Sequence, residues 1–318
     1  MSKNKLTSSA QGHKSGFVSI VGRPNAGKST LLNALVGHKL AIVSERPQTT
    51  RAAIQGVLTR PDAQIVFLDT PGIHESTKLL NRRMMEAVRT ALEERDAVLY
   101  LGDATLKFTP EDARALDVLK GVKTPVLLLL NKIDRVQDKR ELLPRIEEYR
   151  AAREFAQIIP VSAITGEGVD RTMEALLNYL PAGPAYFPPD HITDQPERFM
   201  AAEIIREKIL RETRQEVPHA VAVVIDRWQE TPRLTRIAAT IYVERDGQKA
   251  IVIGSKGSVL KKVGTHARRE MEALFSHRIF LELFVKVRRD WRDNRGFLET
   301  IDWRTMRGAE LETDLSEK

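Results

Sequence analysis

The nine residues GRPNAGKST at 22–30 constrain this 318-residue chain more than any other segment. They match the pattern G-x-x-x-x-G-K-[ST] and lie between a β-rich run, GFVSIVG at 16–22, and a helical pattern at 28–37. In that context the glycines let the backbone wrap closely around phosphates, and N–H groups with the helix N-terminus supply partial positive charge. The segment therefore predicts a phosphate-binding loop between a strand and a helix.

Strand and helix patterns alternate along the first 180 residues. Most strand candidates are continuous apolar runs, which suit strands covered on both faces by helices. The expected strands are 16–22, 53–60, 64–70, 97–103, 126–132 and 156–162. The expected helices are 28–37, 78–94, 109–120, 138–153 and 168–180. This alternation predicts an α/β fold with a doubly wound, mainly parallel sheet.

Three side chains carry the chemistry of the phosphate-binding loop. Lys28 should reach the β- and γ-phosphates of a nucleotide, and the Ser29 hydroxyl should bind Mg²⁺. Thr30 is expected near the α-phosphate. We therefore predict a nucleoside triphosphate that binds together with Mg²⁺.

Two later motifs, DTPG with Asp69 and Gly72 and PQTTR with Thr49 and Thr50, are typical of segments that sense the nucleotide. Asp69 is placed to hold a water on Mg²⁺, and the Gly72 N–H can contact the γ-phosphate and report its loss. Thr50 is predicted to supply a second hydroxyl to Mg²⁺, with Thr49 as the competing candidate.

The base is selected by LLLLNKID at 127–134, at the end of a buried strand, where a doubly wound sheet places its ligand. The Asp134 carboxylate can accept hydrogen bonds from guanine N1–H and N2–H₂, whereas adenine would leave that carboxylate unpaired. Asn131 should brace the loop and meet the base edge, and the Lys132 stem should lie along the ring. SAITG, after another apolar strand, should complete the pocket, mainly through backbone groups of its first two residues.

A change of composition marks a second domain. Residues 181–196 contain five of the 15 prolines, which disfavours a helix and indicates a linker. Beyond them we expect a helix at 197–213, strands at 219–228 and 234–245, GSKG at 254–257, a helix at 258–275 and a strand at 279–288. The predicted division is a flexible basic tail (1–15), a nucleotide-binding domain (16–180), a linker (181–196), a small α+β domain (197–304) and a polar tail (305–318).

GSKG predicts a nucleic-acid clamp, because glycines let backbone pass close to a strand while nearby basic residues meet phosphates. Residues 248–289 hold ten basic and three acidic residues, a net charge of +7 that equals the charge of the whole chain. The inner helix face, which includes Val263, Ala267 and Met271, should pack on the sheet. Val252 and Ile253 are expected to be strand residues of the core.

The predicted site residues form three sets. The GTP-binding set is Gly22, Arg23, Pro24, Asn25, Ala26, Gly27, Lys28, Ser29, Thr30, Gln48, Thr49, Thr50, Asp69, Thr70, Pro71, Gly72, Asn131, Lys132, Ile133, Asp134, Val161, Ser162 and Ala163. Within it, the catalytic residues are Lys28, Thr50, Asp69 and Gly72, and the Mg²⁺ residues are Ser29, Thr50 and, through water, Asp69. The RNA-binding set is Gly254, Ser255, Lys256, Gly257, Lys261, Lys262, Arg268 and Arg269.

The ordered motifs of the first domain resemble those of Ras-like GTPases. Joined to GSKG, VGTHAR and LFVKVRRDWRDN at 283–294, they resemble the Era-like GTPases of the TrmE-Era-EngA superfamily over residues 16–304. The resemblance implies a Ras-like G domain followed by a smaller type II KH domain. It also implies a monomeric GTP-hydrolysing protein of bacterial ribosome assembly, whose KH domain binds the 3′ end of small-subunit (16S) ribosomal RNA. Peripheral membrane association is a further implication.

The residue after Gly72 departs from the Ras pattern. There a Gln can position the attacking water, whereas Ile73 cannot, so no certain general base is present and slow intrinsic turnover is expected. Some relatives with Asn at the position of Asn25 bind K⁺ between the phosphates. The resemblance therefore raises K⁺ stimulation as a hypothesis.

Two other function classes fit the sequence less well. A constitutive RNA-binding adaptor with a structural guanine nucleotide is the alternative, but it would not need the Mg²⁺-switch residues. A metabolic nucleotide kinase would lack a second phosphate-acceptor site and leave the second domain unexplained. The net charge of +7 favours a polyanionic partner, and the absence of cysteine fits a reducing cytoplasm, where we expect the protein, with a possible membrane-associated fraction.

Overall fold

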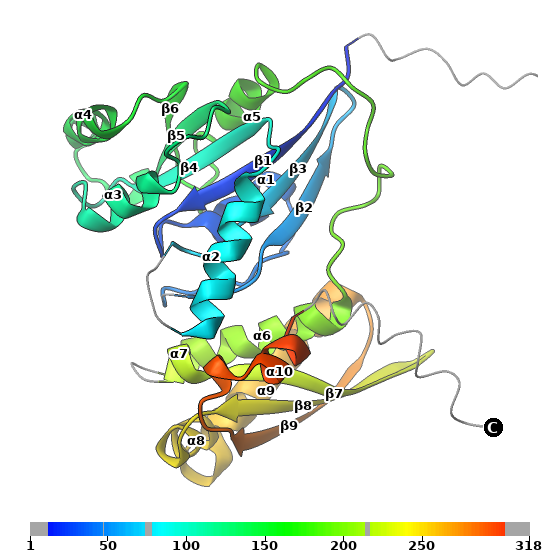
Figure 1. Ribbon diagram of the computed structural model, residues 1–318. Coiled ribbons are helices and arrows are strands. Elements are labelled where there is room, and N and C mark those ends of the chain that lie inside the picture. Colours follow the sequence, from blue (N-terminus) through cyan, green and yellow to red (C-terminus); the bar gives the residue numbers. More distant parts are fainter. Residues whose placement is uncertain (1–11, 47, 74–77, 214–216, 303–318) are drawn as a thin grey trace, which may run out of the picture. The chain divides into compact units, whose positions relative to one another are not determined.

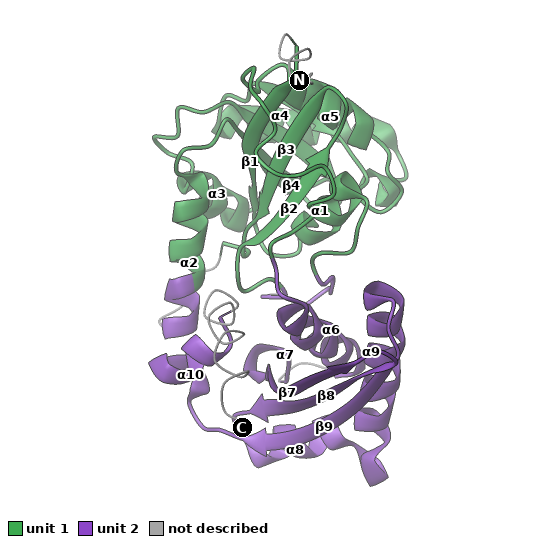
Figure 2. Ribbon diagram, turned by 90° about the vertical axis from the view of Figure 1, so that its right-hand side faces the viewer, with its two compact units in different colours: residues 1–41, 50–74, 84–194 green, residues 42–49, 75–83, 195–318 purple. Residues whose placement is uncertain are grey.

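The computed structural model describes residues 12–46, 48–73, 78–213 and 217–302 (Figure 1). The predictions for the N-terminal tail before residue 12, for Pro47 and for the C-terminal tail lie outside these residues. The chain forms two compact units (Figure 2). Unit 1 consists of Met1–Ala41, Thr50–His74 and Met84–Asp194, and unit 2 of Ile42–Thr49, Glu75–Arg83 and Gln195–Lys318. The chain therefore enters unit 2 before the proline-rich segment, through two short stretches of the predicted nucleotide-binding domain.

Unit 1 contains a six-stranded sheet in the order β2-β3-β1-β4-β5-β6. Its strands are β1 (Lys14–Gly22), β2 (Ile54–Thr59), β3 (Ala63–Asp69), β4 (Ala97–Asp103), β5 (Val126–Asn131) and β6 (Gln157–Pro160). All neighbouring strands are parallel except β2, which pairs antiparallel with β3 at one edge. The mainly parallel α/β fold predicted from the alternating pattern is confirmed.

Helices cover both faces of this sheet. They are α1 (Lys28–Val36), α2 (Leu79–Leu92), α3 (Pro110–Asp117), α4 (Leu142–Ala152) and α5 (Val169–Leu177), with short 3₁₀ helices η1 (Ile133–Arg135) and η2 (Lys139–Glu141). In β4, Leu99 packs in the cluster that includes α1 and α5, while Tyr100 packs in the cluster that includes α3 and α4. Every residue of β4 is buried, which explains why its sequence is a continuous apolar run.

Unit 2 contains a three-stranded sheet in the order β7-β8-β9. Its strands are β7 (Ala222–Thr231), β8 (Leu234–Val243) and β9 (Ile279–Val287), with β7 antiparallel and β9 parallel to β8. Its helices are α6 (Glu197–Glu212), α7 (Val217–Ala220), α8 (Asp246–Ile253), α9 (Ser258–Phe275) and α10 (Arg295–Thr300), with 3₁₀ helices η3 (Ser255–Gly257) and η4 (Trp291–Asp293). The long helices α6 and α9 share one core with the sheet.

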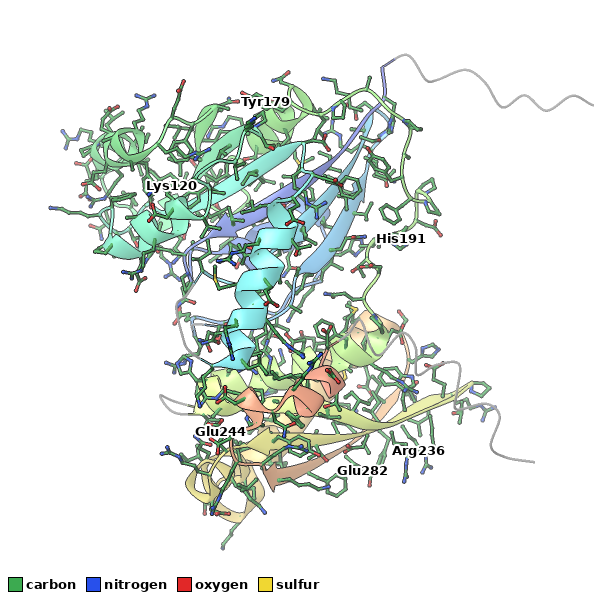
Figure 3. The ribbon with its side chains drawn as sticks, viewed as in Figure 1. Lys120, Tyr179, His191, Arg236, Glu244 and Glu282 are labelled. Carbon is green, nitrogen blue, oxygen red and sulfur yellow. The ribbon has the colours of Figure 1, made fainter. Side chains whose placement is uncertain are left out.

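The helical side of this sheet has the core that the sequence predicts. Val263, Ala267 and Met271 are fully buried between α9 and the sheet, so the predicted inner face of the helix is confirmed. The other face is open in part: Figure 3 shows Arg236 and Glu282 projecting from β8 and β9 on the side away from α6. The alternation of partly buried and exposed side chains along β9 follows from its pleat.

Two sequence predictions for unit 2 differ from the structure, the first in the bounds of a strand and the second in the type of element. The strand expected at 219–228 begins only at Ala222, because α7 occupies the residues before it. Val252 and Ile253 lie on helix α8, although Val252 is fully buried, as expected for a core residue. The start of α8 is fixed by Gln248, whose Oε1 accepts hydrogen bonds from the N–H groups of the two residues before the helix. A short apolar run before a glycine does not by itself separate a strand from a helix.

No helix among the described residues is long and apolar enough to cross a membrane.

Candidate nucleotide site and nucleic-acid interface

Asn131 joins three motifs of the predicted nucleotide site in unit 1. Its side chain is buried at the end of β5; Nδ2 donates to the Ala26 carbonyl oxygen at 2.8 Å, and Oδ1 accepts from the Ala163 N–H at 3.0 Å. A Cβ on Gly27 would lie 2.3 Å from Asn131 Nδ2, so this close approach requires glycine. The phosphate-binding loop, NKID and SAITG therefore converge at the carboxyl edge of the sheet.

Lys28 is held inside the phosphate-binding loop. Its Nζ donates to the carbonyl oxygens of Gly22 at 3.1 Å and Arg23 at 3.0 Å, and the side chain is buried. Burial lowers the pKa of Lys28 to about 8, while the nearby Asp69 carboxylate opposes this shift. A bound phosphate, like the Asp69 carboxylate, would favour the charged form of the Lys28 ammonium group. The residue is therefore suited to bind a nucleoside triphosphate.

Three oxygen-bearing side chains meet where the sequence predicts Mg²⁺. Ser29 Oγ lies 2.6 Å from Thr50 Oγ1 and donates to Asp69 Oδ2 at 2.7 Å. Asp69 Oδ1 is buried and accepts no hydrogen bond from the described residues, and burial raises the pKa of Asp69 to about 6. Hard oxygen donors and an unsatisfied carboxylate fit a Mg²⁺ site.

The two candidate threonines behave differently. Thr49 Oγ1 donates to the Arg46 carbonyl oxygen at 2.6 Å, whereas Thr50 contacts Ser29. This geometry favours Thr50 as the Mg²⁺ residue. Within the described ranges no group of three or more His, Cys, Asp or Glu side chains could hold a metal.

The motif DTPG runs from the end of β3 to the phosphate-binding loop. A Cβ on Gly72 would lie 2.9 Å from the Cα of Pro24, which shows how closely the two segments approach. Ile73 is partly buried and packs against the cluster of α3 and α4. Thr70 is buried, and its Oγ1 donates to the Ile20 carbonyl oxygen at 2.9 Å. This threonine therefore holds the backbone of the motif in place.

The base-recognition side contains one contact that the sequence reasoning missed. Ser162 was expected to act through its backbone, but its Oγ donates to Asp134 Oδ1 at 2.7 Å. Asp134 itself is exposed. An unpaired carboxylate is costly only when it is buried, so the discrimination against adenine requires that the bound base itself covers Asp134. Ile133 is buried, and its N–H donates to the Val161 carbonyl oxygen at 3.3 Å. The hydrogen bond between Ile133 and Val161 therefore joins the NKID loop, which carries Asp134, to the loop that carries Ser162.

The Arg23 side chain lies against carboxylates within unit 1. Its Nη2 donates to Asp103 Oδ2 at 3.1 Å, and its Nε lies 3.5 Å from Asp112 Oδ1. The sequence does not indicate either carboxylate as part of the site, because Arg23 lies far from both of them in the chain.

GSKG forms a tight turn between α8 and α9 in unit 2. Gly254 has φ 72° and ψ 172°, and a Cβ there would lie 2.5 Å from Val259 Cγ2, so this position requires glycine. Gly257 also has a positive φ of 76°, but no atom of the described residues lies within 4 Å of an added Cβ. Lys256, between them, is exposed. The turn thus presents a basic side chain on a close backbone, as a nucleic-acid clamp requires.

The predicted RNA-binding cations differ in their partners. Lys262 lies 4.0 Å from Glu212, and Arg268 pairs with Glu272 at 3.1 Å. Among the described residues, Lys256, Lys261 and Arg269 have no ion-pair partner. Successive residues of a helix point about 100° apart, so Lys261 and Lys262 cannot both face the phosphates of one nucleic-acid strand equally well. The unpaired Lys256 and Lys261, near the turn, are the strongest phosphate-binding candidates.

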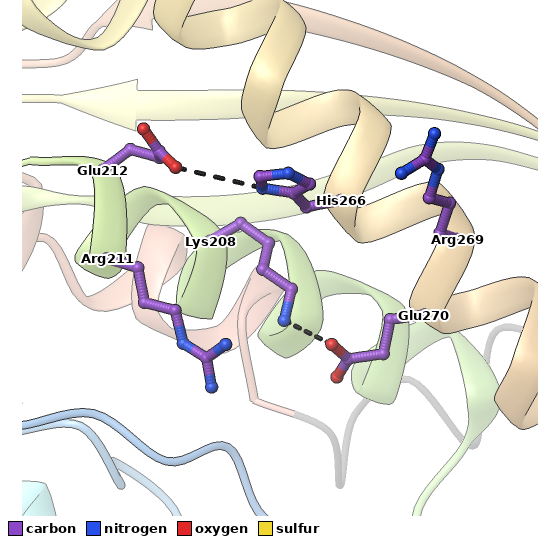
Figure 4. A pocket seen from close by; sticks show the side chains of 6 residues that line it. All are labelled: Lys208, Arg211, Glu212, His266, Arg269 and Glu270. Atoms are coloured by element: carbon purple, nitrogen blue, oxygen red, sulfur yellow. Dashed lines mark hydrogen bonds and ion pairs between the residues drawn. The ribbon is translucent and has the colours of Figure 1, made fainter.

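A pocket of about 540 Å³ lies between α6 and α9 in unit 2 (Figure 4). It is lined by Lys208, Arg211, Glu212, His266, Arg269 and Glu270. Lys208 forms an ion pair with Glu270, and His266 Nδ1 lies 3.9 Å from Glu212. Lys208 is thus neutralised within the pocket, and Arg211 pairs with Glu207 on its own helix.

Comparison with known proteins agrees with both halves of this geometry. A family model described as a 50S ribosome-binding GTPase matches residues 17–132, and a KH domain model matches residues 216–292. The chain is similar to Aquifex aeolicus Era Y63A bound to GDP·AlF₄⁻, with 41% identity, a TM-score of 0.88, and 91% of this chain and 99% of that chain covered. It is also similar to Era in complex with MgGDPNP and nucleotides 1506–1542 of 16S ribosomal RNA, with 41% identity, a TM-score of 0.89, and 92% and 99% covered.

The fold and the site define a phosphate-loop GTPase, an enzyme that uses Mg²⁺ and hydrolyses GTP, followed by a KH domain. The match to both solved Era structures covers 99% of their chains, so it includes the GTPase domain and the KH domain together. The chain belongs to the Era family of GTPases.

Proposed function

We propose that this protein is a GTP-dependent switch that binds the 3′ end of 16S ribosomal RNA through its KH domain and assists small-subunit assembly. The observation that carries the proposal is the 41% identity over 99% of an Era chain solved with both MgGDPNP and nucleotides 1506–1542 of 16S RNA. The GSKG turn with unpaired Lys256 and Lys261 supports RNA contact in this chain. The expected place of action is the cytoplasm, where small subunits are assembled.

We assign the following roles to the residues of the GTP site. Lys28 and the backbone of the phosphate-binding loop hold the phosphates, Asp134 recognises guanine, and Asn131 braces both loops. Ser29, Thr50 and Asp69 hold Mg²⁺, which when bound neutralises charge on the phosphates. Because the apolar side chain of Ile73 packs against the core and cannot position a water, positioning and charge stabilisation by other groups are the main catalytic terms, and intrinsic hydrolysis is slow.

The direct test measures binding of a labelled oligonucleotide with the 16S 3′-end sequence to the full-length protein. The titration is repeated with GDP and with a non-hydrolysable GTP analogue. We expect binding that depends on the nucleotide and falls with increasing salt, since displaced counterions contribute to it. Equal affinity for a scrambled single strand would contradict the assigned RNA target. Equal affinity in both nucleotide states would favour the constitutive adaptor instead.

Gly257→Asp should weaken RNA binding by about tenfold or more while the GTPase rate without RNA stays near that of the wild type. Aspartate tolerates the left-handed backbone better than most residues, and the added Cβ meets no described atom, so the unit should fold. Its carboxylate opposes Lys256 and Lys261 where the backbone must approach phosphates. The measurement is a fluorescence-anisotropy titration of the 3′-end oligonucleotide.

The matched control for this variant is Gly247→Asp. Gly247 is exposed on α8, outside the turn, and an added Cβ there also meets no atom of the described residues. It introduces the same charge into the same unit. If both variants bind RNA as the wild type does, GSKG is not a clamp and the basic stretch is a solvated face.

Potassium should stimulate GTP hydrolysis by about tenfold relative to sodium at equal concentration, if K⁺ supplies positive charge near the phosphates as an arginine finger does. The hypothesis places K⁺ at Asn25, which lies in the phosphate-binding loop with φ 61°. Asn25→Ala should remove the difference between the two salts. The check is steady-state phosphate release in KCl and NaCl, and equal wild-type rates in both would exclude the K⁺ role.

A further inference from the structure

One buried carboxylate in unit 1 lies between the two halves of the nucleotide site. Asp103 ends β4, the strand between β1, which leads into the phosphate-binding loop, and β5, which leads into NKID. Its side chain is only 4% exposed. In the sheet register Asp103 lies opposite Asn131. It therefore occupies the carboxyl edge of the sheet, where a doubly wound fold binds its ligand.

Asp103 Oδ2 accepts from both nucleotide loops. Arg23 Nη2 donates to it at 3.1 Å, and Lys132 Nζ donates to it at 2.6 Å. The other oxygen, Oδ1, accepts from the Thr105 N–H at 3.0 Å and from Thr105 Oγ1 at 2.6 Å. Both oxygens are satisfied, so the carboxylate is fixed in orientation and can fix its two cations in turn.

The Arg23 guanidinium is held from a second side. Its Nε lies 3.5 Å from Asp112 Oδ1, and that oxygen also accepts from the Tyr149 hydroxyl at 2.8 Å. The other oxygen of Asp112 accepts from the N–H and hydroxyl of Thr109, which caps α3. Although burial raises the pKa of Asp103, hydrogen bonds from Lys132 and Thr105 lower it overall, so this residue is a carboxylate at neutral pH.

We propose that Asp103 is a positioning residue for guanine-nucleotide binding. It holds Arg23 of the phosphate-binding loop and Lys132 of the base-recognition loop at one oxygen, so that the phosphate and base halves form one prearranged frame. The inference rests on the GTP site proposed above. Prearrangement lowers the free-energy cost of ordering the loops when the nucleotide binds, and therefore strengthens binding. Arg23 acts through this network, because its guanidinium is directed at carboxylates.

The test replaces Asp103 by Asn, which keeps the shape and removes the charge shared by Arg23 and Lys132. We expect the Kd for fluorescent GDP and the KM for GTP to rise by about tenfold, with kcat reduced less than threefold. A merely unfolded fraction would lower the apparent kcat and leave KM unchanged. The matched control is Asp138→Asn, whose carboxylate pairs only locally with Arg140 on the surface and should leave Kd within twofold of the wild type.

A double-mutant cycle with Lys132→Met shows whether the contact carries the effect. Methionine keeps an apolar stem and removes the ammonium group. If Asp103 acts through Lys132, the double variant should bind GDP at least about fivefold more tightly than the product of the two single effects predicts. Multiplicative single effects, or Asp103→Asn with wild-type Kd, would overturn the inference.

Two outcomes separate this inference from the proposed GTP site. If the wild type does not bind GDP, the GTP site itself is wrong. If Asp103→Asn does not fold, as circular dichroism would show, a cycle of Arg23→Gln and Lys132→Met decides. Each should raise Kd by about tenfold, and the two should deviate from multiplicativity by about fivefold, because they share one carboxylate. Independent effects would contradict a common anchor.

Discussion

Lys28→Ala should lower GTP hydrolysis by at least about 100-fold, the effect of removing one preorganised group that stabilises transition-state charge. Lys28 is buried in the phosphate-binding loop, where its ammonium group donates to loop carbonyl oxygens. Alanine leaves the phosphates without this charge and the two carbonyl groups without their donor. Phosphate release at saturating GTP and Mg²⁺ measures the effect.

Lys120→Ala is the matched control for this loss. Lys120 is a largely exposed lysine of unit 1 (Figure 3), and its Nζ pairs locally with Asp117. Its removal takes the same charge from the surface and should leave the rate unchanged. RNA binding by Lys28→Ala should persist in the absence of nucleotide, since the GSKG turn belongs to unit 2. Hydrolysis by Lys28→Ala at more than a tenth of the wild-type rate would contradict the assigned role.

Asp134→Asn should weaken GTP binding by about 2–4 kcal/mol, roughly 30- to 1,000-fold, and shift preference toward xanthosine triphosphate. In the proposed site the carboxylate would accept from the guanine amine, whereas the asparagine amide can donate to the 2-oxo group of xanthine. The new amide also faces Ser162 Oγ, which can accept from it in place of donating. Competition between GTP and xanthosine triphosphate for a fluorescent GDP probe gives both affinities.

Gain of xanthine binding separates recognition from damage. A variant that merely disturbs the loop would lose both nucleotides together. Asp138→Asn, four residues further along, tests the same chemical change on a side chain that is 44% exposed, and should bind GTP normally. Wild-type GTP affinity in Asp134→Asn would remove the base-recognition assignment.

Local patterns in the sequence predict most of unit 1. Each predicted strand corresponds to a strand of the structure, and for most of them a continuous apolar run of the required length leaves few alternatives in a buried parallel sheet. The phosphate-binding loop, DTPG and NKID converge as expected because all three follow strands and therefore reach the same edge. Unit 2 is predicted less well: the expected strand at 219–228 includes the end of α7, and Val252 and Ile253, at the end of α8, are expected in a strand, since short apolar segments lack a decisive period.

The contacts of Asp103 could not be predicted in the same way. Its two cationic partners lie 80 and 29 residues away in the sequence, so no local spacing indicates the network. The sequence contains one indication of the network, the aspartate that ends the apolar run of β4. At the carboxyl edge of a parallel sheet, a buried carboxylate requires cationic or hydrogen-bonding partners. Ser162 was missed for a related reason: its acceptor, Asp134, is 28 residues earlier.

The assignment of Ile42–Thr49 to unit 2 has a consequence for synthesis of the chain. Ile42 packs in the core of that unit, and the buried Arg206 on α6 donates to the Thr49 carbonyl oxygen. This early segment leaves the ribosome long before Trp291, which is also fully buried. At roughly 5–20 residues per second, the delay is on the order of 10–50 s. Until then Ile42 has no completed core to enter, and the nascent chain still exposes it after β6 has emerged and unit 1 can form its sheet.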